Sequence, residues 1–106
     1  LNGPFGLFID SAGDVVFADS KNNRIRKIFI AAGTIVTIAG DGQGNFRGDG
    51  GPAIQASLLN PHHCAGDLAG NIYFSDSDNH RIRKIDTNGI ITTVAGSGAQ
   101  SFAGDN

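Results

Sequence analysis

The chain has 106 residues, of which 40% are hydrophobic and 17% charged, a balance that excludes disordered and fibrous classes. Its ten acidic residues are all Asp, its net charge is −2, and it lacks Glu, Met and Trp. Because Glu and Met are good helix formers, a chain without them is poor in such residues, and we expect an all-β fold. The charge does not favour a broad nucleic-acid surface, and a single cysteine, Cys64, excludes an internal disulfide.

The first half of the chain predicts four short strands. Apolar or β-branched runs alternate with turns rich in Gly, Asn, Asp and Ser, and the strands are expected at residues 4–10, 15–19, 24–30 and 34–39. A connector dense in Gly and Asp follows, at residues 40–57. No uncharged run reaches the roughly 20 residues that a helical membrane span requires, so no span is expected.

The same pattern then begins again at Leu58. Strands are expected at residues 61–67, 71–76, 81–86 and 90–95. Residues 1–28 and 58–85 share 14 identities in 28 positions, and residues 33–50 and 89–106 share nine in 18. A repeat of this length, with four strands and no helical periodicity, indicates the blades of a β-propeller. We therefore divide the chain into blade one with its long connector, 1–57, and blade two with a shortened connector, 58–106.

The repeated residues resemble the NHL repeat. The pattern that carries the resemblance is Pro-x-x-x-x-x-Asp-x-x-Gly-Asn/Asp-x-x-Phe-x-Asp-Ser-x-Asn-x-Arg-Ile-Arg-Lys-Ile, present twice. The flanking Gly-Asp-Gly-Gly-Pro-Ala is similar to a long-loop variety of that family. This resemblance implies propeller blades of four antiparallel strands. For function it leaves several classes open, because NHL propellers serve as protein-binding, RNA-binding, sensor, scaffold and occasionally lyase modules.

Two blades leave apolar faces and strand edges uncovered, so we expect further blades to complete the propeller. They would come from the same longer chain or from identical chains, three of which would give the six blades usual in the family. We favour a longer repeat array, with self-assembly into a ring or a filament as the competing hypothesis.

Two ion pairs are predicted at the duplicated hairpin. Asp19 and Arg24 flank a four-residue turn, and Asp76 and Arg81 repeat the arrangement. Each carboxylate shares its strand face with apolar residues, where an unpaired charge costs several kcal/mol or more. We therefore expect a structural pair that fixes each hairpin. A catalytic dyad is not expected to be copied unchanged into both blades.

The sequence offers few side chains that could bind a metal ion or a nucleic acid. His62, Cys64 and His80 are weak candidate metal ligands, because neighbours on a strand point to opposite faces and Cys64 aligns with apolar Leu7. The resemblance implies a zinc-dependent lyase only if histidines of other blades complete the site. The Arg-Ile-Arg-Lys clusters lack aromatic stacking partners, so RNA binding is not expected.

The sequence thus predicts a non-enzymatic scaffold or interaction module that needs no metal or other cofactor. Its mechanism is the rigid display of variable loops to a protein partner, in a secreted or cell-surface setting. The alternatives are a self-assembling structural unit and a metal-dependent lyase or hydrolase completed by other blades.

Overall fold

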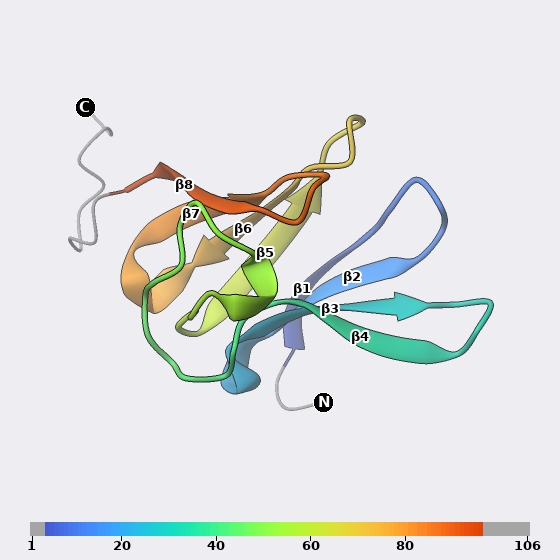
Figure 1. The fold of residues 1–106 in the computed structure, drawn as a ribbon. Coiled ribbons are helices and arrows are strands. Elements are labelled where there is room, and N and C mark those ends of the chain that lie inside the picture. Colours follow the sequence, from blue (N-terminus) through green and yellow to red (C-terminus); the bar gives the residue numbers. More distant parts are fainter. Residues whose placement is uncertain (1–3, 97–106) are drawn as a thin grey trace.

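The computed structural model describes residues 4–96 and contains two four-stranded antiparallel sheets (Figure 1). The first sheet has the order β1-β2-β3-β4, and its strands are Pro4–Ile9, Val15–Asp19, Arg24–Phe29 and Thr34–Ala39. The second has the order β5-β6-β7-β8, with strands Pro61–Gly66, Ile72–Asp76, Arg81–Ile85 and Ile91–Ala95. The predicted all-β class and the two antiparallel four-stranded units are therefore confirmed.

The central hairpins have the same turn in both sheets. A 3₁₀ turn, η1 (Ser20–Asn22), follows β2, and its counterpart η3 (Ser77–Asn79) follows β6. Asn23 and His80 then take left-handed backbone conformations, with φ of 57° and 55°. This turn sets a register in which Asp19 lies opposite Arg24 and Asp76 opposite Arg81, as the sequence predicts.

The two sheets pack face to face through β5. Gly6 on β1 allows the close approach, because a methyl group there would lie 2.6 Å from the His63 Cα atom. Ser20 Oγ donates a hydrogen bond to the carbonyl oxygen of Pro61, across the interface. The shared hydrophobic core takes Val16, Ala18, Ile25 and Ala39 from the first sheet, Phe74, Ile85 and Ile91 from the second, Ala53 and Ala56 from the connector, and Leu58 directly after it.

The connector, residues 40–57, runs along the second sheet before it enters β5 (green in Figure 1). The Gly50 amide donates to the Ile91 carbonyl at 2.7 Å, and the Ile91 amide donates to the Gly51 carbonyl at 3.1 Å. A short 3₁₀ turn, η2 (Ala53–Gln55), then directs Ala53 and Ala56 into the core. The connector that sequence assigns to blade one is thus packed on the second sheet. The division at residues 57 and 58 stays a prediction, and most of the second connector lies outside the described residues.

Arg83 on β7 joins the connector to the second sheet, and its side chain is fully buried. Its guanidinium donates to Asp76 Oδ2 at 3.1 Å and to Asp49 Oδ1 at 3.0 Å. The same group also donates to the carbonyl oxygens of Arg47 and Ser57, at 3.0 and 2.8 Å. We call this set of contacts the Arg83 clamp.

Replacing Arg83 tests how much stability the clamp provides. We expect Arg83→Met to lower the free energy of unfolding by about 3–5 kcal/mol, because it strands a buried carboxylate and removes the donors to two connector carbonyls. Urea denaturation of the full chain measures the loss. Lys84→Met, on the opposite face of the same strand, is the matched control and should cost less than about 1 kcal/mol. Equal losses for the two variants would contradict this assignment.

Candidate interaction surface

The ion pairs of the duplicated hairpin are made with different arginines from those predicted. The Asp19 carboxylate lies 3.5 Å from Arg26 Nε, and the Asp76 carboxylate lies 3.1 Å from Arg83. Both aspartates are fully buried, and each therefore needs a cationic partner. The predicted pairing of Asp19 with Arg24 and of Asp76 with Arg81 is therefore wrong. In each case the partner lies two residues further along the strand, on the same face.

The turn geometry explains this correction. The Asn22 side chain donates to Asp19 Oδ2 at 2.9 Å from within the 3₁₀ turn, so the carboxylate is held from the side of the turn. Arg24 instead extends over the outside of the turn and donates to the carbonyl oxygens of Asn22 and Asp41, at 3.4 and 3.5 Å. Replacing Arg24 is consequently not expected to strand the buried aspartate.

Arg81, the other predicted partner, follows the same course. Its guanidinium donates to the carbonyl oxygen of Asn79 at 3.3 Å and lies over the Phe46 ring, 3.7 Å from the ring centroid. Arg83 approaches the same ring at 4.6 Å. The connector therefore contacts both arginines of the second hairpin. Phe46 contacts Arg81 and Arg83, and Asp49 also binds Arg83.

The weak metal candidates do not form one site. His62 lies on β5 with its ring 6.2 Å from that of His63, whereas His80 occupies the left-handed position after η3. Cys64 points between the sheets, where its thiol lies 3.6 Å from the carbonyl oxygens of Gly6 and Val16. Burial raises the pKa of this thiol to about 11, so it is a poor thiolate ligand. Within residues 4–96, no three His, Cys or Asp side chains are grouped closely enough to hold a metal ion.

Three of the basic side chains in the two clusters are paired with carboxylates. Arg26 and Arg83 are paired with buried aspartates, and Lys27 lies 2.9 Å from Asp10 Oδ2 and over the Phe29 ring. The two Arg-Ile-Arg-Lys clusters therefore do not form one cationic strip, which argues against a phosphate-binding face.

No helix within the described part of the chain has the length and apolar character needed to cross a membrane.

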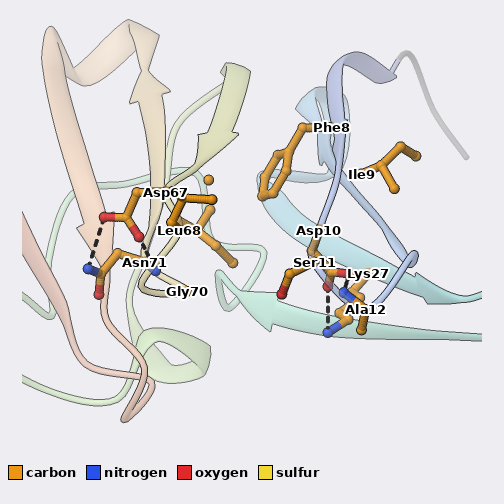
Figure 2. A pocket seen from close by; sticks show the side chains of 12 residues that line it. Phe8, Ile9, Asp10, Ser11, Ala12, Lys27, Asp67, Leu68, Gly70 and Asn71 are labelled. Atoms are coloured by element: carbon orange, nitrogen blue, oxygen red, sulfur yellow. Dashed lines mark hydrogen bonds and ion pairs between the residues drawn. The ribbon is translucent and has the colours of Figure 1, made fainter.

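An open cleft lies where the β1–β2 turn faces the β5–β6 turn (Figure 2). Its volume is about 820 Å³. One wall is formed by Phe8, Ile9, Asp10, Ser11, Ala12 and Lys27, and the other by Gly66, Asp67, Leu68, Gly70, Asn71 and Ile72. A methyl group on Gly66 would overlap the Phe8 ring, so this glycine allows the two walls to meet at that point. We call this feature the turn cleft.

The turn cleft combines exposed apolar groups with fixed carboxylates. Leu68 is fully exposed and Ile9 is 60% exposed, although both are large aliphatic side chains. The Lys27 ammonium, which donates to Asp10, holds the pKa of that carboxyl below its ordinary value. Hydrogen bonds from Asn71 lower the pKa of Asp67 in the same way. Both carboxylates are ionised at neutral pH and Lys27 balances only one of them, so the lining keeps a net negative charge that suits an apolar group beside a cation.

Sequence reasoning missed the turn cleft, although one signal for it exists. The turns Asp-Ser-Ala-Gly at 10–13 and Asp-Leu-Ala-Gly at 67–70 differ in their second residue, Ser11 or Leu68. A large aliphatic residue where the other repeat has a polar one shows that the fold does not dictate the residue at this position, which leaves it available for a contact. The approach of the two turns across the interface could not be predicted from either turn alone.

Comparison with known proteins supports the repeat assignment. The family model of the Teneurin NHL domain matches residues 40–103, which is more than half of the chain. Human Teneurin-4 is 38% identical over 98 residues, covering 81% of this chain and 4% of that protein. Mouse Teneurin-3 is 52% identical over 50 residues, or 47% of this chain and 2% of that protein. The predicted NHL resemblance is thereby confirmed.

A plant relative and two solved structures extend the comparison. SUPPRESSOR OF QUENCHING 1 from Arabidopsis thaliana, described as chloroplastic, is 32% identical over 88 residues, covering 83% of this chain and 8% of that protein. A structural genomics protein from Bacteroides thetaiotaomicron superposes with a TM-score of 0.76 at 26% identity, over 90% of this chain and 24% of its own. Virginiamycin B lyase from Staphylococcus aureus gives 0.63 at 20% identity, over 87% and 26%. The lyase likeness shows the fold alone. The chain spans under a tenth of the length of each of the three sequence relatives named.

The ion pair between Asp10 and Lys27 predicts a pH-dependent contribution to stability. Because the pKa of Asp10 is lower in the folded chain than in the unfolded chain, the contribution is complete above the ordinary pKa, near 3.8. It disappears as the pH falls through the lowered value. We expect the free energy of unfolding of wild type to exceed that of Asp10→Asn by less than about 1 kcal/mol at pH 6, with the difference lost as the pH falls below the lowered pKa of Asp10. Urea denaturation across this range measures it. Lys27→Met should reduce the pH dependence of the difference, leaving the part that the Ala12 and Asp14 amides maintain, and a constant difference in wild type would contradict the pairing.

The burial of Cys64 predicts slow alkylation. With a pKa of about 11, almost no thiolate is present at pH 8. We expect iodoacetamide to modify the native chain about a hundredfold more slowly than the urea-unfolded chain, as followed by intact mass. Native and unfolded rates within threefold of each other would mean that the thiol is accessible and unshifted.

Proposed function

Because the chain belongs to the Teneurin NHL domain family, we propose that it is a non-enzymatic scaffold and interaction module within a larger NHL-repeat propeller. The observation that carries the proposal is the turn cleft, an open apolar surface between two sheets that are held rigidly together. Rigid packing lowers the entropy cost of presenting the two turns to a partner. Further blades from the same chain would complete the propeller.

The chemistry of the turn cleft favours a protein partner. Leu68 and Ile9 offer aliphatic contact area on the two walls, and Asp67 precedes Leu68 on the same wall. An apolar side chain flanked by lysine or arginine matches this combination, whereas a phosphate group does not. We therefore propose a polypeptide segment of that kind as the partner, in a secreted or cell-surface setting.

The two alternative functions gain less support. A lyase would need catalytic or metal-binding side chains from other blades, and the likeness to virginiamycin B lyase, at 20% identity, carries the fold alone. Assembly of identical chains has no feature in its favour beyond the uncovered sheet faces. The interaction module is therefore the function that we propose.

Selection from a library of random peptides tests the proposal. We expect the full chain to enrich peptides that pair an apolar residue with lysine or arginine. Leu68→Ser, which copies Ser11 of the first turn, should weaken their binding at least tenfold, because it removes the exposed aliphatic group.

Ile54 provides the matched control, because it is 57% exposed on η2 and does not line the turn cleft. Ile54→Ser should leave the peptide affinity unchanged, as measured by calorimetry. Equal losses for the two variants, or enrichment of acidic peptides, would contradict the proposed surface.

A further inference from the structure

The two sheets carry the same residues on one face, but only one of these faces is covered. Arg83, Ile85 and Ile91 of the second sheet are at most 4% exposed, beneath the connector. Their counterparts in the first sheet are Arg26, Ile28 and Ile35, and we call this set the Arg26 face. The Arg26 side chain is 28% exposed and Ile35 is 48% exposed. Because the side chains are identical in the two sheets, the difference in exposure results from the connector, which covers only the second sheet.

Arg26 also has an unfilled hydrogen-bonding position. Its Nε atom is buried yet donates no hydrogen bond to any residue that the structure describes, although Asp19 Oδ2 lies 3.5 Å away. The equivalent Nε atom of Arg83 donates to Asp49 Oδ1 at 3.2 Å. A buried donor without an acceptor costs about 1–3 kcal/mol, more when the group is charged. The missing acceptor corresponds to a connector carboxylate.

We propose that the Arg26 face binds the connector of a preceding NHL blade, with an aspartate of that connector accepting from Arg26 Nε. This inference rests on the proposed function, because it names the neighbour that the propeller requires at this face. The chemistry of the occupant is read from the connector on the second sheet, in which the Phe46 ring contacts both arginines, Asp49 lies between two glycines, and the backbone pairs with the last strand.

Two further features of the second sheet fit this occupant. The Gly50 and Gly51 backbone pairs with Ile91, so the corresponding connector would pair with Ile35. Ala53 and Ala56 share the buried cluster with Ile85 and Ile91, and equivalent alanines would cover Ile28 and Ile35. Charge, hydrogen bonding and apolar contact therefore select the same kind of segment.

A chain extended at its N-terminus provides the test. Because Leu58 follows the connector as Leu1 would, a copy of residues 40–57 placed directly before Leu1 reproduces the natural spacing. We expect the extension to raise the midpoint of thermal unfolding by about 5 °C or more. We also expect it to slow hydrogen exchange at Arg26 Nε, as observed by nitrogen-15 NMR, toward the rate at Arg83 Nε.

The control is the same extension with the copied Asp49 changed to Asn. It should bind less well, lose most of the thermal gain and leave the Arg26 Nε–H exchanging fast. An extension that produces neither stabilisation nor protection would overturn the proposal. Protection in the unextended chain that grows with concentration and is lost in Asp105→Asn would assign the face to a second copy, and would likewise overturn it.

These outcomes are separable from those of the proposed function. The extension is read out at Arg26, whereas peptide binding is read out at Leu68 in the turn cleft. Loss of the Leu68 effect with protection at Arg26 intact would refute the interaction surface alone. An intact Leu68 effect without protection at Arg26 would refute the connector site alone.

Discussion

The described structure depends on one buried cation. Arg83 is removed from water completely, and such a group is tolerated only where its donors are satisfied. The two carboxylates that contact it, those of Asp76 and Asp49, come from the second sheet and from the connector. The guanidinium therefore links a regular β-sheet to a connector that has little secondary structure. This explains why a Gly-rich connector can hold a defined path across a sheet.

The same reasoning explains the difference between the two repeats. The sequence Arg-Ile-Arg-Lys-Ile is identical in both, yet Arg26 is partly exposed and Arg83 is fully buried. Burial is therefore a property of the neighbouring segment and not of the strand that carries the arginine. A repeat protein of this kind gains its stability from contacts between successive units, so each unit is complete only when its neighbour is present.

Much of the fold could be predicted from sequence, because strand alternation and turn residues act locally. The register that places Asp19 opposite Arg24 follows directly from a four-residue turn. The ion-pair partner could not be predicted in the same way. Arg24 and Arg26 lie on one face, and the choice between them depends on how the 3₁₀ turn directs the Asp19 carboxylate. The turn cleft was missed for a related reason, since it forms only where Gly66 lets two turns from different repeats approach.

The differences between the repeats separate structure from function. Residues that satisfy buried charges, such as Asp19 and Arg26, recur in the second repeat because each sheet has the same requirement. Leu68 meets no such requirement, because its side chain is fully exposed and the equivalent residue is Ser11. An exposed aliphatic group in a turn does not stabilise the fold through burial, so its identity is free to follow the partner that we propose for the turn cleft. The invariant arginines thus position the sheets, and the varied turns provide the surface on which specificity can differ.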